Sequence, residues 1–125
     1  MIPYILYVED NENDVTLLRH QLESNAIEVG ILHVETPQAF LATLEYVRPD
    51  LIIADGNVPG FDTTAALDAA KTHCPNVPFF YLTGGLSETR TAAIRAAGAS
   101  GCLFKGDRHA VTSAIRDALR ARAPS

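Results

Sequence analysis

The sequence predicts an α/β fold: a single five-stranded, doubly wound parallel sheet with helices on both of its faces. Short apolar runs alternate with segments in which apolar residues recur at helical spacing, and this alternation occurs five times along the 125 residues. Crossovers between parallel strands are right-handed, and they place the intervening helices on both sides of the sheet. The length suits one domain, so residues 1–125 are expected to fold together.

The first two strand and helix units occupy the N-terminal part of the chain. The first strand is expected over residues 4–8, and the helix after it over about residues 14–24, because residues 11–14 are good helix caps. Residues 29–34 carry apolar side chains at both odd and even positions, which predicts a strand buried on both faces. Thr36-Pro37 predicts the start of a second helix, which carries Phe40, Leu41, Leu44 and Val47.

Three further units complete the predicted sheet. Strands are expected over residues 50–54, 79–82 and 102–104. Helices are expected over about residues 63–72 and 87–97, the second of them ended by Gly98. The last helix carries Val111, Ile115 and Leu119 at helical spacing.

Polar side chains follow four of the predicted strands at the point where each strand ends. Glu9 and Asp10 follow the first strand, Asp55 the third, Thr83 the fourth and Lys105 the fifth. Because parallel strands end at the same edge of a sheet, these side chains are predicted to gather there. The order 2-1-3-4-5, a flavodoxin-like arrangement, places strands 1 and 3 side by side, so Glu9, Asp10 and Asp55 should converge.

Three converging carboxylates predict a cation, because their mutual repulsion must be relieved by protonation or by a bound positive charge. Mg²⁺ suits an open acidic cleft, since it prefers oxygen ligands and keeps several waters. The sequence has no Asp-x-Asp-x-Asp-Gly loop for calcium, and its two distant cysteines do not support a zinc site. With Mg²⁺ in place, Asp55 could act as a nucleophile toward phosphorus, with Lys105 and Thr83 facing the phosphoryl oxygens.

Composition excludes several other classes of function. The formal net charge of −5 and pI near 5.2 argue against a surface that binds nucleic acid directly. The longest apolar runs are far shorter than the ~20 residues that span a bilayer, and no secretory signal is evident. The two cysteines provide no disulfide framework, so a cytoplasmic location is expected.

Over nearly its whole length the sequence resembles the receiver domain of two-component response regulators. The resemblance is carried by LYVEDN at residues 6–11, by DLIIAD at residues 50–55 with Val-Pro-Gly at 58–60, by Leu-Thr-Gly at 82–84, and by Gly98-Ala99 followed by Lys105. It implies a phosphoprotein that acts as a switch in a two-component or phosphorelay system, and not an enzyme with its own substrate. The chain would be a stand-alone receiver or the receiver segment of a hybrid kinase.

The resemblance also implies a role for each matching residue. Asp55 would take a phosphoryl group from the phosphohistidine of a sensor histidine kinase or a histidine phosphotransfer protein. Asp10, Asp55 and the main-chain carbonyl of Asn57 would bind Mg²⁺, and Glu9 would hold a water of that ion. Thr83 and Lys105 would clasp the phosphoryl group. A downstream protein would bind the face formed by the fourth helix, the fifth strand and the fifth helix, and a homodimer is left open.

Two positions depart from the family pattern and leave alternatives open. Cys102 stands where an aromatic switch residue is common, and Gly106 stands where proline commonly follows the lysine. Both changes bear on signal transmission. Phe104 is a candidate to replace part of the function of the missing aromatic switch residue. One alternative is therefore a receiver-like interaction scaffold that works without phosphorylation. Another is a Mg²⁺-dependent phosphatase of the haloacid dehalogenase type, although that type expects its nucleophilic Asp on the first strand and a second Asp two residues later.

Overall fold

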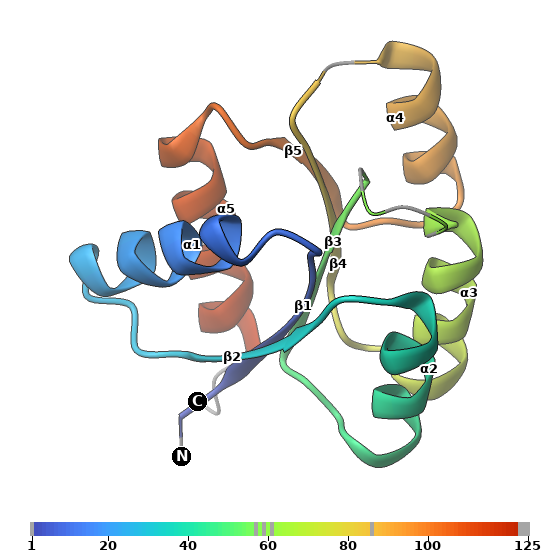
Figure 1. Cartoon of the computed structure of the whole chain (residues 1–125), viewed down its shortest axis with the longest axis horizontal. Coiled ribbons are helices and arrows are strands. Elements are labelled where there is room, and N and C mark those ends of the chain that lie inside the picture. The colour runs from blue at the N-terminus through green and yellow to red at the C-terminus, as the bar shows by residue number, and fades with distance from the viewer. Residues whose placement is uncertain (1, 57, 59, 61, 86, 123–125) are drawn as a thin grey trace.

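The computed structural model describes residues 2–56, 58, 60, 62–85 and 87–122 and shows the predicted sheet (Figure 1). Five parallel strands lie in the order β2-β1-β3-β4-β5, which confirms both the fold class and the strand order. The strands are β1 (Tyr4–Val8), β2 (Gly30–Val34), β3 (Leu51–Asp55), β4 (Phe79–Thr83) and β5 (Gly101–Phe104). The helices are α1 (Glu12–Ser24), α2 (Pro37–Tyr46), α3 (Thr63–His73), α4 (Glu88–Ala96) and α5 (Arg108–Arg122).

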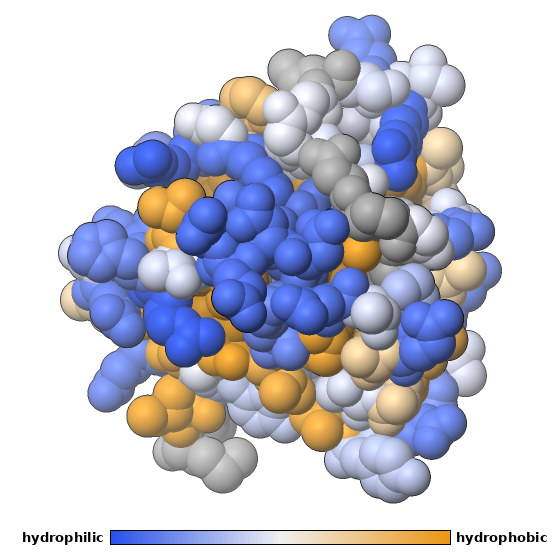
Figure 2. Space-filling model, in the orientation of Figure 1, coloured by the Kyte–Doolittle hydropathy of each residue, from blue (hydrophilic) through white to orange (hydrophobic). Residues whose placement is uncertain are grey.

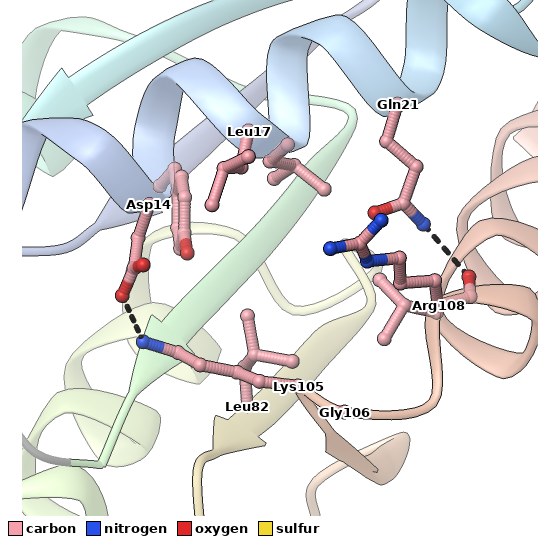
Figure 3. A pocket seen from close by; sticks show the side chains of 10 residues that line it. Asp14, Leu17, Gln21, Leu82, Lys105, Gly106 and Arg108 are labelled. Atoms are coloured by element: carbon pink, nitrogen blue, oxygen red, sulfur yellow. Dashed lines mark hydrogen bonds and ion pairs between the residues drawn. The ribbon is translucent and has the colours of Figure 1, made fainter.

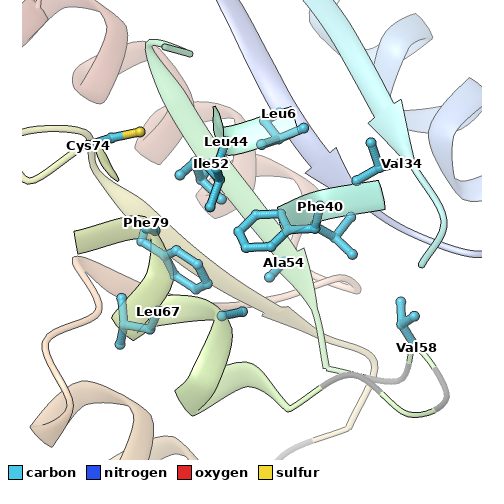
Figure 4. Packing of buried hydrophobic residues seen from close by; sticks show 13 residues of the cluster. Leu6, Val34, Phe40, Leu44, Ile52, Ala54, Val58, Leu67, Cys74 and Phe79 are labelled. Atoms are coloured by element: carbon cyan, nitrogen blue, oxygen red, sulfur yellow. The ribbon is translucent and has the colours of Figure 1, made fainter. Parts of the chain in front are cut away.

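Alternation along the strands divides the core into two layers. The even-numbered side chains of β1 and β3, such as Leu6 and Ile52, pack with Phe40 and Leu44 of α2 and Leu67 of α3 (Figure 4). The odd-numbered side chains of the same strands pack with α1 and α5 in the second cluster, which includes Ile5, Tyr7, Leu18, Ile53 and Ile115. Helices α1 and α5 therefore cover one face of the sheet, and α2, α3 and α4 lie on the other (Figure 1).

Side-chain caps set where the helices begin. The Asn11 side chain accepts a hydrogen bond from the Asn13 N–H at 2.9 Å, so α1 begins at Glu12 and not at about residue 14. Asp62 caps α3 and Ser87 caps α4 in the same manner, close to the predicted starts. Helix α2 ends at Tyr46, because Val47 adopts an extended conformation as its C-cap. None of the described helices is both long and apolar enough to cross a bilayer.

Strand β2 differs from the prediction of a strand buried on both faces. It forms one edge of the sheet and pairs only with β1. Leu32 is 37% exposed, and Val34 is the strand's one buried residue. An apolar sequence does not distinguish a central strand from an edge strand that the neighbouring helices cover only in part.

Candidate functional site

Lys105 lies among three carboxyl groups at the carboxyl edge of the sheet. Its Nζ atom is 2.6 Å from Asp55 Oδ2, 2.7 Å from Asp14 Oδ2 and 3.3 Å from Glu9 Oε2. Oxygen atoms of Glu9, Asp14 and Asp55 all lie within 4.8 Å of one another. Asp55 and Glu9 are almost completely buried, whereas the Asp14 side chain is 30% exposed. The group is thus accessible to solvent from the side of Asp14.

Strand parity explains why Glu9, Asp55 and Lys105 meet. Glu9 continues the odd positions of β1, and Asp55 continues those of β3, so both side chains lie on the face covered by α1 and α5. Lys105 has the parity of Leu103, whose side chain packs against the same layer. The Lys105 N–H donates to the Thr83 carbonyl at 2.8 Å, which fixes the end of β5 beside β4. These three predicted residues are therefore brought together by the sheet itself.

Asp14 is a member of this group that the sequence analysis missed. It lies in the first turn of α1, which begins directly after the Asn11 cap. Leu18 and Leu22 follow Asp14 at intervals of four and are buried against the sheet. An acidic residue at the start of such an apolar stripe was the available signal, because it places a carboxylate on the helix face that looks toward the sheet edge.

Asp10 and Thr83, two further predicted site residues, make none of the ion pairs described above for Lys105. Asp10 is exposed, and Asn57 falls outside the described residues. The Thr83 hydroxyl donates to the Gly85 carbonyl at 2.7 Å and accepts from the Gly85 N–H at 3.2 Å. Its strand parity matches Phe79, which places Thr83 on the face opposite Asp55. The hydroxyl is thus held by its own loop.

The carboxyl groups and the lysine perturb one another strongly. Burial, and then contact with the Asp55 carboxyl, raises the pKa of Glu9 to about 9 against the opposing charge of Lys105. Burial alone would lower the pKa of Lys105, but hydrogen bonds to Asp14 and Asp55 and the nearby negative charges raise that pKa above its ordinary range. Glu9 therefore keeps its proton at neutral pH, and the charges of Asp14 and Asp55 face a single ammonium.

A family model for the response regulator receiver domain matches residues 5–116, which include all of the sheet except Tyr4 and the cluster of carboxyl groups around Lys105. The chain belongs to this family. The resemblance predicted from four separated motifs is confirmed, and the receiver fold accounts for the helices on both faces of the sheet. A search among curated protein sequences finds no significant match.

Solved structures of other receiver domains share the fold at low sequence identity. A response regulator from Hahella chejuensis has a TM-score of 0.88 at 23% identity over 98% of this chain and 99% of that one. The Mn²⁺-bound form of the response regulator Rcp1 has a TM-score of 0.82 at 23% identity over 98% and 99%. The receiver domain of a sensor histidine kinase from Pseudomonas aeruginosa, with a magnesium ion in its active site cleft, has a TM-score of 0.80 at 22% identity over 96% and 99%.

The donor atoms of this receiver domain fit a hard divalent cation. All three acidic members of the group offer carboxyl oxygens, and the described residues contribute no sulfur ligand to it. Lys105 neutralises part of their charge in the present arrangement. Figure 2 shows hydrophilic side chains gathered over α1 and the end of β1, where this group lies. An ion would thus be approached through a polar surface.

A pocket of about 270 Å³ adjoins Lys105 between α1 and α5 (Figure 3). Asp14 and Lys105 form one end of its lining. Leu17 and Arg108 lie farther from the cluster of carboxyl groups. The Gln21 amide donates to the Arg108 carbonyl at 2.7 Å and ties the two helices together. The site of this receiver domain is therefore open on the side where α1 carries Asp14.

The two unusual positions of this receiver domain make specific contacts. The half-buried Cys102 thiol donates to the Thr91 carbonyl of α4 at 3.8 Å, so it joins β5 to that helix. A Cβ atom at Gly106 would lie 2.4 Å from the Phe104 ring, so glycine leaves room for the ring over the loop. Phe104 itself is 37% exposed. The small residue after Lys105 and the aromatic residue before it thus depend on each other.

A third contact joins α4 to the turn after Asp55. Arg90 donates to the Gly56 carbonyl at 3.0 Å, and its guanidinium lies 5.8 Å from the centre of the Tyr81 ring. A Cβ atom at Gly56 would lie 2.1 Å from the Tyr81 hydroxyl oxygen. The turn that follows Asp55 therefore requires glycine and is held from α4.

Proposed function

We propose that this receiver domain is a phosphoacceptor switch in which Asp55 takes a phosphoryl group from a phosphohistidine. The observation that supports this most strongly is the buried Asp55 carboxylate at the end of β3, with Lys105 Nζ 2.6 Å away. The donor would be a sensor histidine kinase or a histidine phosphotransfer protein, and the proposed location is the cytoplasm. The family match makes this reading preferable to a haloacid dehalogenase type phosphatase.

In the proposed reaction an Asp55 oxygen attacks phosphorus, and a P–O bond forms as the P–N bond of the donor breaks. The donor imidazole leaves with the electron pair of that bond, and the product is an acyl phosphate. Lys105 is already within 2.6 Å of Asp55, so its ammonium can move onto a phosphoryl oxygen over a short distance. The charge that develops on the phosphoryl oxygens is thereby stabilised by the Lys105 ammonium, which is in place before the reaction begins.

Mg²⁺ is the proposed cofactor, and when bound it neutralises negative charge on the carboxylates and the phosphoryl oxygens. Asp10, Asp55 and the main-chain carbonyl of Asn57 would hold it, with Glu9 beside them. Asp10 follows Glu9 directly and is exposed, so its side chain is free to turn toward the cluster. Glu9 would lose its proton as the positive charge arrives, because an adjacent cation lowers the pKa of a carboxyl group.

Thr83 is the proposed link between the phosphoryl group and the protein surface. Its hydroxyl would leave Gly85 and donate to a phosphoryl oxygen, which would move the loop that precedes α4. The proposed partner would bind the face formed by α4, β5 and α5, and it would distinguish the two positions of this loop. A second copy of the chain is one candidate for this partner, and the complex would then be a homodimer.

Intact-mass measurement tests the proposed function. The protein is incubated with a small phosphodonor, such as acetyl phosphate, in the presence of Mg²⁺. The wild type should gain one phosphoryl group, and Asp55→Asn should gain none. Equal labelling of the two proteins would refute Asp55 as the acceptor. Absence of labelling in both would instead favour the interaction scaffold that works without phosphorylation, an alternative supported by the unusual Cys102 and Gly106.

A further inference from the structure

Two carboxylates on different elements contact the Lys105 ammonium at nearly the same distance. Asp55 Oδ2, at the end of β3, lies 2.6 Å from Lys105 Nζ. Asp14 Oδ2, in the first turn of α1, lies 2.7 Å from the same atom, and Figure 3 shows this second contact. Glu9 is farther away, at 3.3 Å and 3.5 Å. The position of the ammonium therefore depends mainly on two carboxylates that belong to different elements, β3 and α1.

Phosphorylation would change these two anchors unequally. At Asp55 it would replace a carboxylate by an acyl phosphate, whose outer oxygens lie farther from the strand. At Asp14 nothing would change, and its full negative charge would remain beside the lysine. Lys105 would then have to divide its hydrogen bonds between the phosphoryl oxygens and Asp14. An ammonium on a flexible stem has three donors, and it is drawn to whichever anions lie within reach.

We propose that Asp14 is a positioning residue that competes with the phosphoryl group for the ammonium of Lys105. This inference rests on the proposed function, since it concerns the phosphorylated form of Asp55. Asp14 holds the lysine ready between α1 and β3 in the unphosphorylated protein. In the phosphorylated protein it draws the lysine back, and its own charge opposes that of the phosphoryl group. The expected consequence is that Lys105 holds the phosphoryl group less tightly than it would without Asp14.

If Asp14 had a purely structural role, its charge would act on helix α1 and not through Lys105. Acidic residues in the first turn stabilise a helix through its dipole, and α1 carries two of them, Glu12 and Asp14. Glu12 is exposed, and the ion pairs of Lys105 within the described residues go to Glu9, Asp14 and Asp55. Glu12→Gln therefore removes the same charge from the same turn without touching the lysine, and it is a matched control for Asp14→Asn.

The test is the affinity of the full chain for beryllofluoride, an anion that imitates an attached phosphoryl group. Dissociation constants are measured for the wild type, Asp14→Asn and Glu12→Gln at a Mg²⁺ concentration that saturates each protein. Asp14→Asn should bind beryllofluoride about three- to fivefold more tightly than the wild type, which is the upper part of the range for partly exposed ion pairs. Glu12→Gln should bind it as the wild type does. The ¹⁵Nζ signal of Lys105 in the unliganded protein should shift in Asp14→Asn alone.

Two different failures can be told apart. If the wild type binds beryllofluoride and Asp14→Asn binds it equally or more weakly, the competition is refuted while the proposed function stands. An equal gain in Glu12→Gln would also refute it, because the gain would then reflect the net charge of the helix turn. If the wild type does not bind beryllofluoride at all, the proposed function fails and the competition fails with it.

Discussion

Lys105 Nζ reaches Asp55 Oδ2 at 2.6 Å although the strands that precede these residues are not neighbours. Lys105 follows β5 and Asp55 ends β3, and β4 lies between the two strands. The lysine side chain therefore crosses the end of β4 to reach the acids. This contact holds three adjacent strands together at the edge where the acidic side chains gather.

Lys105→Met should destabilise the protein in the absence of metal, because it leaves two carboxylates and a buried carboxyl group without a cation. We expect the free energy of unfolding to fall by about 1–3 kcal/mol, less than for a fully buried pair because the lysine side chain is 23% exposed. Urea unfolding measures this loss, and added Mg²⁺ should restore part of it. Lys71→Met removes the other lysine of the chain and is the control, since any loss there should not respond to Mg²⁺. Equal stability of Lys105→Met and the wild type would argue against the lysine's role.

Mg²⁺ should stabilise the folded wild type, because the unfolded chain does not assemble the acidic group. The gain follows RT ln(1 + [L]/Kd), or about 1.4 kcal/mol when free Mg²⁺ is about ten times Kd. Asp10→Asn should reduce this response if Asp10 turns toward the ion as proposed. Thermal unfolding with and without Mg²⁺ at constant ionic strength provides the measurement. A melting temperature that does not respond to Mg²⁺ would remove the metal from the account.

The stability of the metal-free protein should fall as pH rises from about 4.5 to about 9, because the pKa of Glu9 is raised from 4.5 to about 9. A folded-state pKa above the unfolded value means that the folded protein binds the proton more tightly. The contribution of Glu9 is therefore complete below the lower value and is lost as pH passes the higher one. Each pH unit within this window lowers the free energy of unfolding by up to about 1.4 kcal/mol for one proton.

Glu9→Gln should remove most of this slope, since a glutamine does not titrate. Urea unfolding across the window, in the presence of a chelator, compares the variant with the wild type. The raised pKa of Lys105 does not interfere, because its contribution is lost only above the ordinary lysine range. The same slope in both proteins would show that Glu9 is not the group responsible.

The sheet and most of the acidic site could be predicted from the sequence because both depend on strand periodicity. Glu9, Asp55 and Lys105 each follow an apolar run, and parallel strands must end at one edge. Asp14 was missed because an acidic residue near a helix start is ordinarily a cap or dipole contact, and its reach to Lys105 depends on where α1 crosses the sheet. The exposure of Leu32 was missed because the extent to which helices cover an edge strand cannot be predicted from its apolar residues.

Amide hydrogen exchange should locate the response to phosphorylation in the loop after β4. Thr83 is bonded to Gly85, and Cys102 offers a thiol to Thr91 in place of an aromatic ring that could change position. We therefore expect beryllofluoride with Mg²⁺ to alter protection across residues 83–88 and to change residues 101–118 little. Large changes across residues 101–118 would show that another group, such as Phe104, transmits the signal.

Mapping of the modified residue tests the central claim most directly. Borohydride reduces an acyl phosphate to an alcohol, so a phosphorylated aspartate becomes homoserine, which peptide mass spectrometry can place in the sequence. After treatment with a phosphodonor and Mg²⁺, the account predicts homoserine at position 55 and at no other aspartate. Homoserine at Asp10 or Asp14, with Asp55 unchanged, would contradict it.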